Sequence, residues 1–168
     1  PTADAITEWG TMEVPACWQL HGCGAPNYAN VRYPYPVDPP FVPDINPMGV
    51  YRRTFTYQDP EKQLYLVLEG VGSCAEVELN GQYIGYTQGA HLQAEFDLTA
   101  AAHAGENTLV IRVRKWCSGS YLEDQDFLRF SGLFRDVYLL ERPVGHAADI
   151  EVRTEENRRL FVRTDRPT

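Results

Sequence analysis

Hydrophobic and polar side chains alternate with a period of two through most of the chain. In residues 74–79 the order Cys-Ala-Glu-Val-Glu-Leu puts apolar side chains on one face and two glutamates on the other, which predicts a half-buried β-strand. The pair Asn80-Gly81 follows directly and predicts a tight turn into a strand over residues 82–86, because both turn positions need positive φ. The same alternation predicts strands over residues 50–57, 64–69, 109–114 and 137–142.

Strands spaced this closely predict an all-β fold. No window of 11 or more residues shows a helical stripe, and only residues 98–104 are compatible with a single turn, ended by Gly105. Turns rich in glycine and proline separate the strands, which favours a two-sheet sandwich or a jelly roll.

Two segments inside this pattern are predicted to be irregular. Residues 33–47 contain six prolines and should run extended with little sheet pairing. Residues 116–135 alternate between polar and aromatic side chains and lie between two clear strands. A loop of this length within a compact domain is usually functional or disordered, and its aromatic content argues against disorder.

The pattern changes after the sequence Pro143-Val144-Gly145. Residues 147–153 and 160–164 resemble two short strands around a polar turn, as if a second domain began there. We therefore divide the chain into a β-sandwich domain over residues 1–143 and a linker with the start of a following domain over residues 144–168.

Composition narrows the range of partners. The 168 residues include 15 Lys and Arg against 23 Asp and Glu, a formal net charge of −8, which disfavours nucleic acid and anionic membranes as partners. No apolar run approaches the ~20 residues that span a bilayer. The chain lacks a starting Met and a signal-peptide pattern, so it reads as an excised piece of a longer protein whose compartment is not encoded here.

The four cysteines form no Cys-x-x-Cys pair, which disfavours a zinc site. Cys17 and Cys23 are close enough in sequence to form a disulfide, although free thiols are the favoured interpretation. The simplest role for all four is that of small apolar side chains.

Two features carry candidate chemistry. Asp124 and Asp126 would lie about 6.6 Å apart on one face of an extended strand, close to the spacing of a glycosidase carboxyl pair, but a solvated or salt-bridged acidic loop is favoured over that pair. Aromatic rings beside amides and carboxylates are also typical of sugar sites, and an aromatic core is the equal alternative. The side chains that would supply such a site are Trp18, Tyr28, Asn30, Tyr121 and Asp126.

Several strings of residues together resemble β-galactosidases of glycoside hydrolase family 2, over about residues 9–143. They are Trp-Gln-Leu-His-Gly at 18–22, Ala-Pro-Asn-Tyr-Ala-Asn-Val at 25–31, Asn-Pro-Met-Gly-Val-Tyr at 46–51, and Ser-Tyr-Leu-Glu-Asp-Gln-Asp at 120–126, followed by Arg129, Ser131-Gly132 and Phe134-Arg135-Asp136-Val137. The resemblance implies a jelly-roll, galactose-binding-like β-sandwich, followed by the first strands of an immunoglobulin-like domain.

The resemblance also implies a function. The domain would help to bind terminal β-galactosides in a retaining β-galactosidase, whose catalytic glutamates lie in a TIM barrel outside this chain, so the fragment holds no catalytic residue and hydrolyses nothing alone. Residue by residue, Asn30 matches an asparagine that reaches the galactose site, Val31 lies beside it, and Asp126 matches an aspartate that binds a galactose hydroxyl and a sodium ion.

The resemblance extends to cofactors and partners. The barrel would supply the other sodium ligands, so sodium binding by the isolated domain should be weak, and magnesium would bind the parent enzyme through the barrel. The implied partners are a galactoside and the remaining domains of a homo-oligomeric parent, for which the cytoplasm is the favoured compartment. Two alternatives are a free-standing carbohydrate-binding module and a small hydrolase using Glu123, Asp124 or Asp126.

Overall fold

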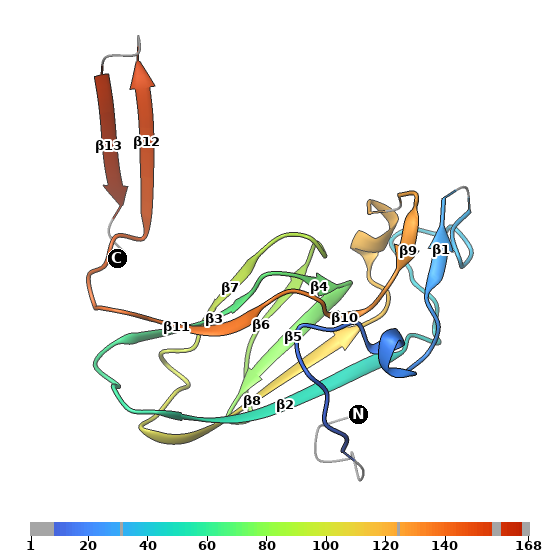
Figure 1. Cartoon of the computed structure of the whole chain (residues 1–168), viewed down its shortest axis with the longest axis horizontal. Coiled ribbons are helices and arrows are strands. Elements are labelled where there is room, and N and C mark those ends of the chain that lie inside the picture. Colours follow the sequence, from blue (N-terminus) through green and yellow to red (C-terminus); the bar gives the residue numbers. More distant parts are fainter. Residues whose placement is uncertain (1–8, 31, 124, 156–158, 166–168) are drawn as a thin grey trace.

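Two antiparallel sheets pack face to face in the computed structural model, which describes residues 9–30, 32–123, 125–155 and 159–165 (Figure 1). One sheet has the strand order β2-β8-β5-β6 and the other β11-β3-β7, while three further pairs, β1-β9, β10-β4 and β12-β13, are two-stranded. The strands are β1 (Asn27–Ala29), β2 (Met48–Tyr57), β3 (Gln63–Leu68), β4 (Val71–Gly72), β5 (Cys74–Leu79), β6 (Gln82–Gln88), β7 (Ala94–Asp97), β8 (Gly105–Arg114), β9 (Phe127–Arg129), β10 (Gly132–Leu133), β11 (Val137–Arg142), β12 (Asp149–Glu155) and β13 (Arg159–Asp165). The described residues also include two 3₁₀ turns, η2 (Trp18–His21) and η3 (Ser118–Tyr121). The predicted all-β sandwich is confirmed.

The hydrophobic core lies between the two larger sheets and follows the predicted alternation. Its apolar side chains come from β3, β5 and β8 and include Leu64, Leu66, Leu68, Ala75, Val77, Leu79, Leu109, Ile111 and Val113. On the opposite face of β5, Glu78 pairs with Arg112 at 2.8 Å and Glu76 with Arg114 at 3.4 Å. The glutamates of the alternating pattern therefore lie on the outer face of the sheet.

The turn between β5 and β6 is the predicted two-residue hairpin. Asn80 has φ of 53° and Gly81 of 80°, which gives the twist that antiparallel strands favour. The Asn80 amide also donates to the Oδ1 atom of the fully buried Asn107 at 2.8 Å, and its own Oδ1 accepts from the Thr108 amide at 2.9 Å. The turn residue thus ties the hairpin to β8.

The predictions were wrong at the shortest elements. The segment 116–135 is not one irregular loop, since it contains η3, β9 and β10. Strands of two or three residues are too short to show an alternation.

The single turn predicted at residues 98–104 is confirmed. The amides of Ala101 and Ala102 donate to the Leu98 carbonyl, and Gly105 then begins β8 with φ of 95°. The favoured interpretation of the cysteines is also confirmed, since all four are free thiols.

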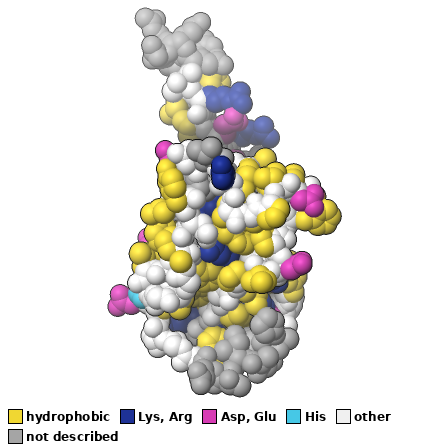
Figure 2. All heavy atoms as spheres, turned by 90° about the vertical axis from the view of Figure 1, so that its right-hand side faces the viewer, with side chains coloured by type: hydrophobic (Ala, Val, Ile, Leu, Met, Phe, Trp, Pro, Cys, Tyr) yellow, Lys and Arg dark blue, Asp and Glu magenta, His cyan; other side chains and the backbone are white. Residues whose placement is uncertain are grey.

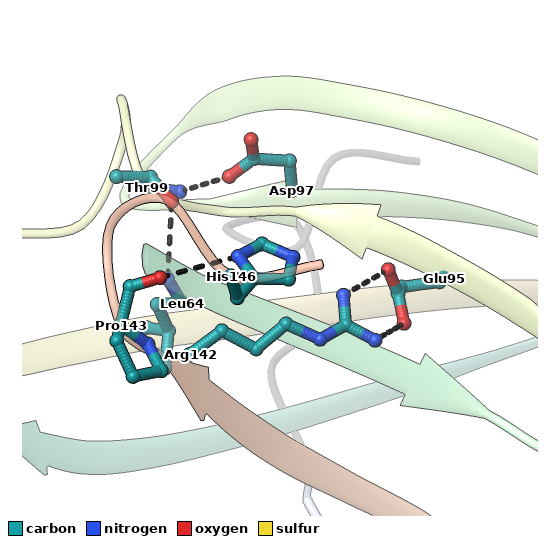
Figure 3. Close-up of polar contacts among 7 residues, drawn as sticks. All are labelled: Leu64, Glu95, Asp97, Thr99, Arg142, Pro143 and His146. Atoms are coloured by element: carbon teal, nitrogen blue, oxygen red, sulfur yellow. Dashed lines mark hydrogen bonds and ion pairs between the residues drawn. The ribbon is translucent and has the colours of Figure 1, made fainter. Parts of the chain in front are cut away.

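The chain leaves the sandwich through a fixed corner (Figure 3). Arg142, the last residue of β11, forms two hydrogen bonds to Glu95 of β7 at 2.5 and 2.6 Å, and its guanidinium lies 4.5 Å from the Tyr65 ring centroid on the strand between them. The amide of His146 then turns back to the Pro143 carbonyl at 3.1 Å. Beyond this corner the hairpin β12-β13 stands away from the sandwich, at the two strands predicted there (Figure 1).

The assignment of this hairpin to an immunoglobulin-like domain, and the division at residues 143 and 144, stay predictions. Within the described ranges, no helix is long and apolar enough to cross a membrane.

Replacing Leu66 tests the core. Leu66 is 1% exposed at the centre of β3, so Leu66→Ala should lower the free energy of unfolding by about 2–5 kcal/mol through lost burial and a residual cavity. Leu92, which is 72% exposed, is the matched control, and Leu92→Ala should change it by less than about 0.5 kcal/mol. Urea denaturation followed by tryptophan fluorescence gives both values, and equal effects would contradict this core assignment.

Candidate functional site

A two-stranded ribbon joins segments from opposite ends of the domain. In β1 and β9, Asn27 pairs with Arg129 and Tyr28 pairs with Leu128. The ribbon lies outside the two main sheets at one end of the molecule (Figure 1). Figure 2 faces this end and shows hydrophobic side chains over much of its surface. Side chains from two of the sequence motifs are thus placed together at an exposed end.

A chain of hydrogen bonds crosses this ribbon. The Tyr28 hydroxyl donates to the Asp126 carboxylate at 2.6 Å, and the Asn30 amide nitrogen donates to the same hydroxyl oxygen at 3.1 Å. All three residues are exposed, and Tyr28 is 61% exposed. The two predicted site residues Asn30 and Asp126 therefore lie together, bridged by one tyrosine. Val31, the third predicted residue, lies outside the described residues.

Buried side chains hold the backbone beneath Asp126. Ser120 is fully buried, and its hydroxyl accepts a hydrogen bond from the Cys117 amide at 3.1 Å, which caps η3. Arg129, also buried, donates from Nη2 to the Ser120 carbonyl at 2.9 Å, and its guanidinium lies 5.4 Å from the Phe127 ring centroid. A buried cation that hydrogen-bonds backbone fixes the ends of the segment that carries Asp126.

The acidic cluster is divided among separate roles. Glu123 accepts a hydrogen bond from the Ala90 amide at 2.6 Å, so it ties the segment to the loop that follows β6. Asp126 lies directly before β9, where its carboxylate accepts from Tyr28. Asp124 lies outside the described residues, so its pairing with Asp126 stays a prediction. Among the residues that the structure describes, no group of three His, Cys, Asp or Glu could hold a metal ion.

Tyr121 fastens the proline-rich segment. Its hydroxyl donates to the Phe41 carbonyl at 2.5 Å and accepts from the Asp38 amide at 3.2 Å, while its carbonyl accepts from the Tyr33 hydroxyl at 2.6 Å. Its ring packs edge-on against Tyr35, whose centroid is 5.5 Å away. Burial raises the pKa of Tyr35, with a further contribution from Tyr121.

Two of the candidate aromatic residues have structural roles in place of sugar contacts. Trp18 is buried in the core, and a Cβ atom at Gly49 would lie only 2.2 Å from its ring, so the glycine makes room for the indole. The Tyr121 hydroxyl is bonded to the proline-rich segment. Of the two alternatives, an aromatic core describes Trp18, and a sugar contact at the remaining ring, Tyr28, stays a prediction.

Sequence reasoning missed the residues that join the motifs. The Gln19 side chain accepts from the Ser131 amide at 2.9 Å and donates to the Ser131 hydroxyl at 3.2 Å, so η2 is attached to the short connection between β9 and β10. Both residues are buried and polar, and both lie in the strings that carry the resemblance. Their position in those strings was the available signal, but it does not reveal which residues pair.

The chain is similar to known proteins over most of its length. The profile of "Glycosyl hydrolases family 2, sugar binding domain" matches residues 3–143. The chain belongs to this family. A β-galactosidase of Enterobacter cloacae is 48% identical over 161 residues, which cover 94% of this chain and 15% of the relative, and one of Yersinia pestis is 47% identical over 152 residues, which cover 89% and 14%.

A solved structure supports the fold of this sugar-binding domain. A β-glycosidase from Bacteroides vulgatus superimposes with a TM-score of 0.66 and 23% identity, and the match covers 94% of this chain and 20% of that one. The chain spans about one seventh of the length of the curated β-galactosidases that it matches.

Removing one hydroxyl tests how the proline-rich segment is held. Tyr121→Phe keeps the ring but loses the bonds to Phe41 and Asp38, so the free energy of unfolding should fall by about 1 kcal/mol. Amide exchange measured by NMR should accelerate more at Asp38 and Phe41 than in β5, because β5 is affected only through the global change. Tyr83→Phe, at an exposed tyrosine of β6, is the control, and equal exchange in both variants would count against this anchor.

Proposed function

We propose that this chain is the sugar-binding domain of a retaining β-galactosidase and supplies Asn30 and Asp126 to the site for a terminal β-galactoside. The observation that carries the proposal is the Tyr28 hydroxyl between the two side chains. The curated relatives at 47 and 48% identity are β-galactosidases, which supports the choice of sugar.

The chemistry of this trio suits a sugar hydroxyl. A carboxylate only accepts hydrogen bonds, whereas an amide both donates and accepts them. A sugar hydroxyl can therefore donate to Asp126 and accept from the amide of Asn30. The Tyr28 hydroxyl is hydrogen-bonded to both Asp126 and Asn30, so the two side chains are already oriented before the sugar binds. Less conformational entropy is then lost on binding. This arrangement favours binding, and neither residue is assigned a part in bond cleavage.

Asp126 also fits the proposed sodium ion. Hard cations prefer oxygen ligands, and the Asp126 carboxylate is exposed while one of its oxygens is oriented by Tyr28. A single carboxylate in water binds a monovalent ion weakly, so the remaining sodium ligands would come from other domains of the protein. Magnesium, if the parent enzyme uses it, would likewise be held by those domains.

Exposed apolar side chains support contact with the remaining domains. Leu122 is 90% exposed and Leu128 48% exposed, and both lie near Asp126 in the chain. Figure 2 shows further hydrophobic side chains over this end, and a large exposed apolar surface marks an interface, so a neighbouring domain that covers it would also close the sugar site. We place the two catalytic carboxyl groups in a TIM barrel among those domains, and expect no hydrolysis by this chain alone and a homo-oligomeric parent.

The C-terminal hairpin supports a following immunoglobulin-like domain. An isolated two-stranded hairpin is only marginally stable in water. Ile150, Val152 and Val162 on β12 and β13 are exposed, so the pair needs further strands to cover an apolar face.

Replacing Asp126 in the complete β-galactosidase separates charge from geometry. In Asp126→Asn the amide oxygen can still accept from Tyr28, but the negative charge is lost. We expect weaker galactoside binding, seen as a several-fold higher KM, together with a reduced response of the rate to added sodium chloride. Steady-state kinetics with a chromogenic galactoside across sodium concentrations, with potassium chloride holding ionic strength constant, gives both.

Asp59→Asn is the control, because Asp59 is an exposed aspartate paired with Lys62 and lies outside the ribbon. It should leave KM and the sodium response unchanged. An unaltered sodium response in Asp126→Asn would refute the metal role, whereas an unaltered KM would refute the sugar contact.

Shortening Asn30 tests a contact made equally in the ground and transition states. Asn30→Ala should raise KM several-fold while kcat changes little, as expected for uniform binding. Asn157→Ala, at an asparagine far away in the sequence, is the control for the same substitution. A large fall in kcat at constant KM would instead place Asn30 in the chemical step.

A further inference from the structure

Two buried cysteines from distant parts of the sequence meet beneath the segment that carries Asp126. Cys74 begins β5 and is 2% exposed, while Cys117 precedes η3 and is 6% exposed. Ser73 fixes their approach: its amide donates to the Arg114 carbonyl at 3.0 Å, and its hydroxyl donates to the Lys115 carbonyl at 2.8 Å. The Cys117 sulfur then lies 3.8 Å from the Ser73 carbonyl oxygen.

The surroundings of the two sulfurs differ. The two thiols share a hydrogen bond, the Cys117 thiol also donates to the Ser73 carbonyl, and the Ser120 hydroxyl of η3 donates to the Cys117 sulfur at 3.9 Å. The hydrogen bond from Cys74 lowers the pKa of Cys117, and the Ser120 hydroxyl and the amides of Gly119 and Ser120 add to this against the effect of burial. The same hydrogen bond and burial raise the pKa of Cys74. Cys117 is therefore the more acidic thiol of the two.

Gly119 and the Gln88 side chain lie over the Cys117 sulfur. A Cβ atom added at Gly119 would lie 3.4 Å from Gln88 Oε1 and 3.5 Å from the Cys117 sulfur, and the Gly119 amide donates to that same Gln88 oxygen at 3.4 Å. Ser118, the neighbouring residue, is exposed. Hydrogen peroxide would therefore approach beside Gly119 when the Gln88 side chain moves aside, whereas a larger thiol reagent is hindered.

We infer that Cys117 and Cys74 form an oxidation site, at which a hydroperoxide converts the two thiols into a disulfide. The Cys117 thiolate attacks one peroxide oxygen, the O–O bond breaks, and hydroxide leaves to become water by taking a proton from solvent. The resulting Cys117 sulfenic acid is attacked by the Cys74 sulfur, which breaks the S–O bond. The Cys74 proton leaves with that oxygen as a second water, so two thiols and one peroxide yield one disulfide and two waters.

The disulfide would join the start of β5 directly to the start of η3. The segment from η3 to Asp126 would then be attached covalently to the larger sheet. The other two cysteines lack this arrangement: burial raises the pKa of Cys17, and Cys23 is exposed, where its sulfur contacts the His21 carbonyl.

The test uses the whole chain with Cys17→Ser and Cys23→Ser, which leaves only the buried pair. Treatment with hydrogen peroxide under native conditions should remove two hydrogens from the intact mass. Digestion without reductant should give a peptide pair linked through Cys74 and Cys117, which dithiothreitol separates. Stable over-oxidation of Cys117 without a linked peptide, or loss of no thiol while the folded protein persists by circular dichroism, would overturn the inference.

Two variants in the same background establish the order of events. Cys74→Ala should gain one oxygen at Cys117 as a sulfenic acid, read by intact mass and peptide mapping, whereas Cys117→Ser, which keeps a capping side chain, should leave Cys74 unreacted. Oxidation of Cys74 in Cys117→Ser at the parental rate would overturn the assignment of Cys117 as the reacting thiol. Gly119→Ala should slow disulfide formation several-fold without preventing it, and an unchanged rate would overturn the proposed path of approach.

Discussion

The pairing of β1 with β9 is the constraint on which the candidate site depends. The Tyr28 hydroxyl and the Asp126 carboxylate are 98 positions apart in the sequence, and only the register of this short ribbon brings them within 2.6 Å. Six main-chain residues are too few to hold such a ribbon alone, since isolated strand pairs are marginal in water. The buried Arg129 therefore stabilises the ribbon from inside the domain, through its hydrogen bond to the Ser120 carbonyl.

The irregular layer around the ribbon replaces sheet pairing with side-chain contacts. Residues 33–47 contain six prolines and cannot form a regular ladder, yet backbone polar groups still require partners. Tyr121 supplies partners to Phe41 and Asp38, and the Asn46 side chain pairs with both the amide and the carbonyl of Trp116. Single side chains thus supply the hydrogen bonds that a neighbouring strand would otherwise make.

The parts of the fold that the sequence reveals are those with a repeating pattern. The alternation in β5 and the pair Asn80-Gly81 identify a hairpin and its buried face, because each residue there obeys a local rule. β1 and β9 follow no such rule, since three residues carry no period and their pairing is a long-range event. The resemblance to a family located Asn30 and Asp126, but the bridging by Tyr28 and the burial of Trp18 against Gly49 required coordinates.

The bond between Arg142 and Glu95 has a mechanical consequence. β11 and β7 are the outer strands of the three-stranded sheet, and this ion pair spans the strand between them at the point where the chain departs. A force applied through the C-terminal hairpin and directed along β11 would act on the hydrogen bonds between β11 and β3. All six paired positions would then carry the force together, in shear, before any one of them opened. Part of that load would pass through Arg142 to β7, so the exit corner would resist tension better than a strand that peels from its end.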